Sequence, residues 1–106
     1  GEFLMTDYLA DVKKYDAAAD SAVVDKIVKH LGIALRNHDS SLVSATDQKE
    51  LDRVRDSWGV KKLGVDAAAA EAAVGKVAKA MAGDRSKGRV TFYYLVAKEL
   101  GKLQSL

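Results

Sequence analysis

A basic segment bounded by glycines, GDRSKGRV at residues 83–90, comes closest in this sequence to the spacing of a chemical motif. Its glycines have the G-x-x-x-x-G spacing of a phosphate-binding loop, in which backbone amides at the start of a helix hold an anion. Such a loop also needs a following Lys-Ser or Lys-Thr pair and a preceding strand. The pair is missing here, and the pattern before the segment indicates a helix. A nucleotide-binding loop is therefore not predicted.

The same segment is a candidate for binding anions through charge alone. Arg85, Lys87 and Arg89 belong to a stretch, residues 76–102, that holds seven Lys and Arg against two Asp and Glu. Binding to nucleic-acid phosphates strengthens with the number of such cations and weakens with salt. Helical periodicity spreads these cations over several faces, and no row of base-reading side chains accompanies them. Solvated surface is the simpler interpretation, and weak binding of nucleic acid or another acidic partner is the alternative.

Catalytic and metal chemistry have little support in the residue types present. The chain has no cysteine, and its two histidines are His30, in a predicted helix, and His38, beside Asp39 in a predicted loop. Nucleophilic catalysis needs a nucleophile beside an oriented base, and no such motif occurs. Neither the H-E-x-x-H pattern nor the spacing of a calcium loop is present. We expect no enzyme activity, no metal and no cofactor.

The aromatic segment RVTFYYLVAKELGKL, residues 89–103, is the densest apolar stretch of the chain. Its composition suits a strand, but a single strand among helices would leave its backbone groups without partners, so we predict a helix. A helix that is apolar nearly all round is either buried centrally or shared with another subunit. We expect a homo-oligomer, with a dimer favoured. The candidate residues for self-association are Phe92, Tyr93, Leu95 and Val96.

The elements around this segment are predicted to be helices as well. The chain contains no proline and much alanine, and apolar residues recur at helical spacing. The fold class is therefore all-α, a compact bundle of about five helices. Expected helix starts are Thr6/Asp7, Asp16 or Asp20, Asp47 paired with Glu50 as a capping box, Asp66, and Arg89. Gly59 is expected to bend or fray the third helix.

Two parts of the chain resemble each other. Aligning residue 16 with residue 66 matches DAAADSAVVDKIVKHL to DAAAAEAAVGKVAKAM, and Trp58 then falls on Tyr94 in the helices that follow. The bundle is thus consistent with an N-terminal helix followed by two related helical hairpins. The alternative is that two helices rich in Ala, Val and Lys resemble each other through composition alone.

Composition sets the size and surroundings of the fold. A chain of 106 residues with 48% hydrophobic and 30% charged residues is enough for one soluble domain. We expect residues 1–4 to be an expression remnant and residues 5–106 a single helical domain. The absence of cysteine and of a long apolar run favours a cytoplasmic location with no membrane segment.

Several stretches together resemble a known family. They are DYLADVKKY, IVKHLGIALRNHDSSLVSATD, RVRDSW, KKLGV and GDRSKGRVTFYYLVAKELGKL, which cover most of residues 7–103. In these stretches the chain resembles a bacterial family of small helical proteins, domain-of-unknown-function family 2853. The resemblance implies a bacterial, cytosolic, helical protein, and it brings no activity, cofactor or partner. Our expectation is a non-enzymatic protein with an interaction or structural role.

Overall fold

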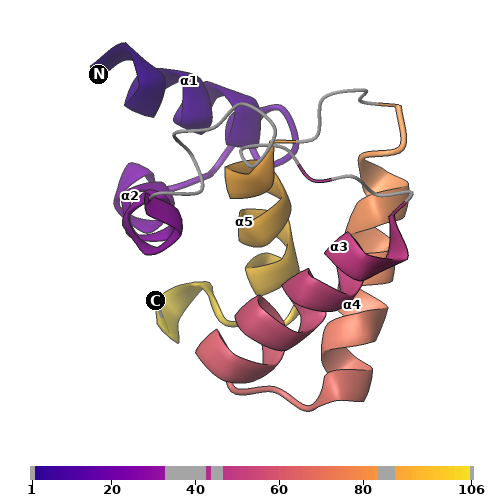
Figure 1. Ribbon diagram of the computed structural model, residues 1–106. Helices are drawn as coiled ribbons and strands as arrows, with labels where there is room; N and C mark the ends of the chain where they lie inside the picture. Colours follow the sequence, from indigo (N-terminus) through magenta and orange to yellow (C-terminus); the bar gives the residue numbers. More distant parts are fainter. Residues whose placement is uncertain (1, 33–42, 44–46, 84–87, 106) are drawn as a thin grey trace.

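Helix α5, Arg89–Glu99, runs through the middle of the molecule with the other helices arranged around it (Figure 1). The computed structural model describes residues 2–32, 43, 47–83 and 88–105. Over these residues the chain is built from helices and turns, which confirms the predicted all-α bundle. The remaining elements are α1 (Glu2–Lys13), α2 (Ser21–Leu31), α3 (Gln48–Arg53), the π-type helix η2 (Val54–Lys62), α4 (Ala67–Ala80) and the short 3₁₀ helix η3 (Leu103–Ser105).

Three helices begin at aspartate caps, as the sequence predicts. Asp20, Asp47 and Asp66 each accept a hydrogen bond of 2.7–3.0 Å from a backbone amide in the first turn of α2, α3 and α4. These amides have no partner within the helix, so a side-chain oxygen at this position stabilises the helix end. Of the two candidates for α2, Asp20 is the cap, and Asp16 lies in the preceding turn.

The ends of α1 and α2 differ from the prediction. Helix α1 begins at Glu2, before the expected start at Thr6/Asp7, because residues 2–5 contain no glycine or proline to stop it. Residues 2–4 are thus part of a helix in this structure. Helix α2 ends at Leu31, where Gly32 adopts a positive φ of 39°, a conformation that suits glycine at a helix end.

The third predicted helix is widened over most of its length. After α3, the chain continues as η2, in which the amide of Leu63 donates to the carbonyl of Trp58, five residues earlier, at 2.9 Å. Such wide turns are rare in proteins. Gly59 lies inside η2 against α4, where an added Cβ would come within 2.5 Å of the Cβ of Ala70. The predicted irregularity at Gly59 therefore takes the form of a wide helix that packs closely on α4.

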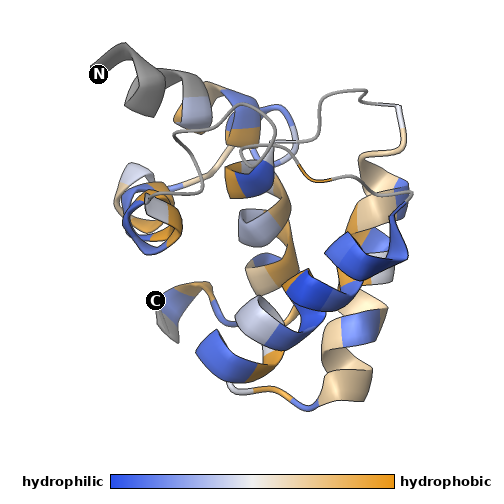
Figure 2. Ribbon diagram, viewed as in Figure 1, coloured by the Kyte–Doolittle hydropathy of each residue, from blue (hydrophilic) through white to orange (hydrophobic). Residues whose placement is uncertain are grey.

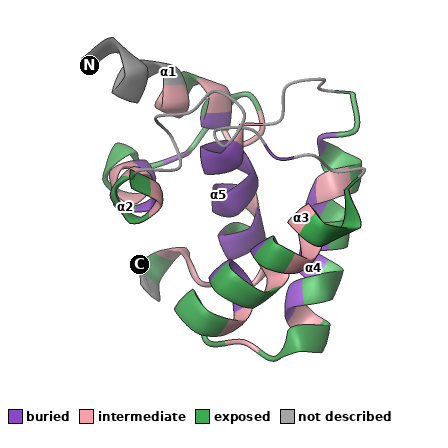
Figure 3. Cartoon of the chain, in the orientation of Figure 1, coloured by how far each residue is buried: buried purple, intermediate pink, exposed green. Residues whose placement is uncertain are grey.

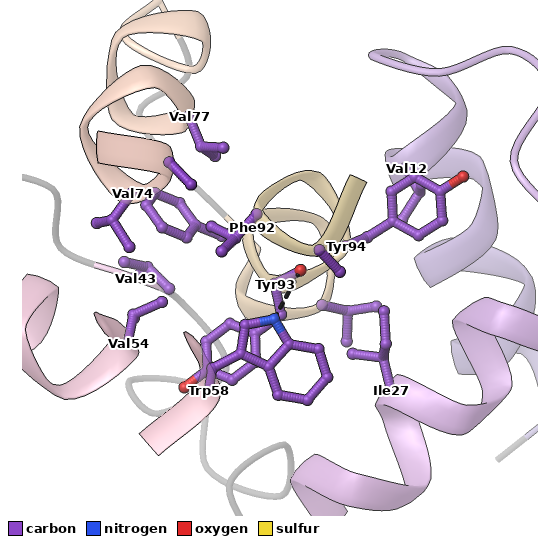
Figure 4. Packing of buried hydrophobic residues seen from close by; sticks show 14 of the residues in the cluster. Val12, Ile27, Val43, Val54, Trp58, Val74, Val77, Phe92, Tyr93 and Tyr94 are labelled. Atoms are coloured by element: carbon purple, nitrogen blue, oxygen red, sulfur yellow. Dashed lines mark hydrogen bonds between the residues drawn. The ribbon is translucent and has the colours of Figure 1, made fainter. Parts of the chain in front are cut away.

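The core surrounds α5 on most sides. Eight of its eleven residues are buried, including Val90, Phe92, Tyr93, Tyr94 and Val96 (Figure 3). Figure 4 shows Phe92 pointing toward Val74 and Val77 of α4, while Tyr94 points toward α1 and Ile27 of α2 lies below it. The two alternatives for an apolar helix are thus resolved: α5 is buried within its own chain.

The two related hairpins can be compared in part. Helices α4 and α5 pack against each other as consecutive antiparallel neighbours, as expected of a hairpin (Figure 1). Helix α2 packs mainly on α1 and α5, and the connection from α2 to α3 lies largely outside the described residues. The proposed duplication stays a prediction.

Candidate functional site

The three basic residues proposed to contact anions are not presented together on a surface. Arg85 and Lys87 lie outside the described residues. Arg89 is buried, with 6% of its surface exposed, and its guanidinium forms an ion pair with Glu50 of α3. Nη1 of Arg89 also donates to the hydroxyl of Tyr93 at 3.2 Å. Its charge is paired inside the fold, which leaves it little exposed to an external anion, and the proposed anion contact stays a prediction.

A line of side chains extends from this ion pair to the surface. The rings of Tyr93 and Trp58 lie 4.9 Å apart, and the indole Nε1 of Trp58 donates to the backbone carbonyl of Tyr93 at 2.9 Å (Figure 4). His30 of α2 follows, with its ring 5.1 Å from that of Trp58. Glu50 was expected to act in a capping box with Asp47, and its contact with Arg89 was not predicted. An arginine at the start of an apolar helix indicates a buried charge that needs an acid, but Glu50 lies 39 residues away.

His30 lies on the exposed side of α2 and yet has a shifted pKa. Partial burial of its ring lowers the pKa of His30 below its ordinary value, and the positive charge of Lys62 lowers it further. The neutral form is therefore favoured in the folded protein. The prediction that His30 is a partly exposed helix residue agrees with its position, and His38 lies outside the described residues.

The residues proposed for self-association separate into two groups. Phe92, Tyr93 and Val96 are buried in the core of the same chain, so in this conformation they have no surface to offer a second copy. Their assignment to an interface is untested and has no support from their burial here. Leu95 differs, because it is only half-buried and lies on the side of α5 that turns toward α4 and Tyr15.

Leu95 forms part of the floor of a groove between α4 and α5, which we call the Leu95 groove. Its volume is about 480 Å³. Leu95, Tyr15, Val77 and Ala80 provide the apolar lining, and Lys76, Lys98 and Glu99 provide the charged lining. A groove of this size, with an apolar floor and a few charged groups, is typical of a binding surface.

Two ion pairs lie at the rim of the Leu95 groove, so the rim carries both positive and negative charges. Nζ of Lys76 lies 2.8 Å from Oε1 of Glu99, and this hydrogen bond raises the pKa of Lys76. On the other side Nζ of Lys98 lies 3.4 Å from Oδ2 of Asp16. The hydroxyl of Tyr94 donates to the same carboxylate oxygen at 2.7 Å, which lowers the pKa of Asp16, whereas burial raises the pKa of Tyr94. These contacts attach the turn after α1 to α5.

A second, smaller groove of about 210 Å³ lies on the other side of α4, against α3 and η2. Leu51, Val74 and Gly75 line it together with polar side chains. Arg55 lies 2.8 Å from Asp56 and within 4 Å of two further carboxylates, and the hydrogen bond with Asp56 raises the pKa of Arg55. We call this the α3–α4 groove.

The linings of the two grooves combine apolar residues with Lys, Arg, Gln, Asp and Glu side chains. In the part of the chain that the structure describes, no cluster of three or more His, Cys, Asp or Glu could hold a metal ion. None of the described helices has the length and apolar character required to cross a bilayer. What the arrangement offers is apolar surface edged with opposite charges.

Comparison with known families identifies the chain. The model of a family described as Protein of unknown function (DUF2853) matches residues 7–104. The chain belongs to this family. The DUF2853 match extends from within α1 to η3, so both grooves and the line from Glu50 to His30 lie within the family domain. No curated protein matches the chain.

Proposed function

We propose that this protein is a non-enzymatic interaction module of the bacterial cytosol, and that it self-associates through the face that carries the Leu95 groove. The observation that carries the proposal is the partly exposed position of Leu95 in the apolar lining of that groove. Burying a leucine side chain fully contributes about 1.5–3 kcal/mol. Leu95 is already partly buried, so a second copy that covers it gains only part of this stabilisation, at two sites when the dimer is symmetric.

The charges at the rim favour a second copy as the occupant. Lys76 and Lys98 lie close to Glu99 and Asp16, so the same face presents both signs. In a twofold dimer one surface patch meets itself, so a patch with both signs can place each cation of one copy near an anion of the other. A strongly basic or acidic partner would meet repulsion from half of these groups.

The test measures oligomeric state by light scattering after size exclusion over a range of concentrations. We expect the wild type to approach twice the 11.4 kDa mass of the chain as its concentration rises. Leu95→Gln keeps a side chain of similar length but removes its apolar character, and it is expected to shift the protein to monomer. Ser21→Glu, at an exposed position in the first turn of α2, is the matched control and should leave association unchanged.

A melting curve of Leu95→Gln serves as the control that the variant still folds. A wild type that remains monomeric at every concentration would remove the proposal. Association of Leu95→Gln to the same extent as the wild type would also contradict the self-association proposal.

Weak binding of nucleic acid or an acidic partner through residues 85–89 is the secondary proposal. It has less support, because Arg89 is paired internally with Glu50. It predicts retention of an oligonucleotide at about 50 mM salt that is lost when Arg85 and Lys87 are neutralised together. No retention at that salt concentration rules it out.

A further inference from the structure

The outer face of α4 lies between the two grooves and carries exposed residues, and Gly75 on this face also borders the α3–α4 groove. Ala68, Ala72, Gly75 and Lys79 are all exposed (Figure 3). Their spacing of four, three and four residues places them along one stripe of the helix. Figure 2 shows α4 with pale apolar turns, which correspond to its alanines, and few hydrophilic positions. Among the exposed residues of α4, Glu71, Lys76 and Lys79 have long side chains, and the others are alanine or glycine.

Gly75 lies at the centre of that stripe and has no explanation within the chain. Glycine is among the poorest helix formers, so an interior glycine lowers the stability of a helix relative to alanine. A Cβ added at Gly75 would meet no atom within 4 Å, whereas one added at Gly59 would collide with Ala70. Close packing inside the monomer therefore accounts for Gly59 and not for Gly75. A glycine on a helix surface allows another backbone to approach closely.

Two charges on this face lie symmetrically about Gly75, and a third, Lys76, lies beside it and is paired with Glu99. Glu71 lies four residues before it and Lys79 four residues after it, about 6 Å along the helix axis in each direction. The side chain of Glu71 is 69% exposed, and its contact with Arg55 is a distant one of 3.9 Å. In two antiparallel copies of α4 that meet at Gly75, Glu71 of each copy lies at the level of Lys79 of the other.

We propose that α4 of one copy packs antiparallel against α4 of a second copy, with the twofold axis passing beside Gly75. The proposal rests on the self-association proposed above and specifies its geometry. The glycine permits close approach, the alanines on either side offer small apolar surface, and the two Glu71–Lys79 pairs fix the register. The Leu95 groove and the α3–α4 groove flank this contact on its two sides, so the interface extends from α4 toward Leu95.

Charge reversal tests the geometry at positions that do not affect the core. Glu71→Lys alone and Lys79→Glu alone each replace two attractive contacts by two repulsive ones, and each is expected to weaken the dimer about tenfold in Kd. The double variant Glu71→Lys/Lys79→Glu restores opposite charges and should return Kd to near the wild-type value. Lys29→Glu, an exposed reversal on α2, is the control and should leave Kd unchanged.

Crosslinking gives an independent readout, because the chain has no cysteine. In the proposed dimer, Glu71→Cys in one copy faces Lys79→Cys in the other. A short reagent with two thiol-reactive groups should therefore crosslink a mixture of the two single variants. It should leave either variant largely uncrosslinked when that variant is treated by itself. Equal linking in all three samples would contradict the antiparallel register.

The outcomes separate the two proposals. A dimer that dissociates in Leu95→Gln but keeps its Kd in both single charge reversals would overturn the α4 pairing and leave self-association in place. A wild type that is monomeric at every concentration overturns both. Restoration in the double variant, together with linking only in the mixture, supports the α4 pairing.

Discussion

Arg89 is accommodated inside the bundle because Glu50 lies against it. The guanidinium also contacts Tyr93, both by a hydrogen bond to the hydroxyl and by its position 5.7 Å from the ring centroid. A buried charge without a partner is costly, so each member of this pair depends on the other. The pair joins α3 to the first turn of α5.

Removal of Glu50 tests this dependence. Glu50→Ala leaves Arg89 buried without its counter-ion and is expected to destabilise the fold by about 3–5 kcal/mol. Urea unfolding measures the change. The double variant Glu50→Ala/Arg89→Met should lose less than the sum of the two single variants, because it removes both charges. An additive double variant would contradict a direct coupling.

His30 gives the stability a dependence on pH. Because the pKa of His30 is lowered in the fold, the unfolded chain binds the proton more readily between the folded pKa and about 6.5. The free energy of unfolding therefore decreases as pH falls through this window, and the effect levels off below the folded pKa. We expect His30→Gln to flatten this part of the profile in thermal melts. A His38→Gln variant, measured beside it, shows which part of the profile belongs to His30.

At the scale of elements, α5 determines which substitutions matter most. Tyr94 is buried and anchored to Asp16 through its hydroxyl, whereas Leu95 faces the groove. We expect Tyr94→Ala to destabilise by about 2–5 kcal/mol, as large-to-small changes in a core do. Tyr94→Phe, which keeps the ring and loses only the hydrogen bond, should cost about 1.5–3 kcal/mol. Leu95→Ala should cost less than Tyr94→Ala, and equal losses in denaturant unfolding would place Leu95 in the core.

The close packing of η2 on α4 gives opposite expectations for two glycines. Gly59→Ala places a methyl group against Ala70 and is expected to destabilise by about 1–3 kcal/mol. Gly75→Ala meets open space in the monomer and should stabilise by up to about 1 kcal/mol. Thermal melts at low concentration compare the two. Equal shifts would show that helix propensity alone, without the contact to Ala70, controls both positions.

The elements were predictable where local chemistry determines them. Aspartate caps predicted three helix starts, and α5 is a helix, as expected because a lone strand would have no partner for its backbone groups. The widened form of η2 was not predictable, because it depends on the fit of Gly59 against Ala70 in another helix. For the same reason the ion pair of Glu50 with Arg89 and the floor of the Leu95 groove emerge only when distant segments meet.

At the scale of the whole molecule, self-association makes stability depend on concentration. A dimer that forms only from folded chains stabilises the fold by mass action, so the melting temperature should rise with protein concentration. Leu95→Gln should show no such rise. Calorimetry at concentrations that differ about a hundredfold makes the comparison, and a concentration-independent wild type would argue for a monomer.

The central position of α5 also affects the order of events during synthesis. Except for the short η3, the helices that pack around it precede it in the chain, and residues 89–99 are translated after them. Until those residues leave the ribosome, α1, α2 and α4 lack the central helix against which they pack. The apolar residues that α5 covers therefore stay exposed. The core is therefore completed late, and we expect a chain truncated before Arg89 to remain incompletely folded.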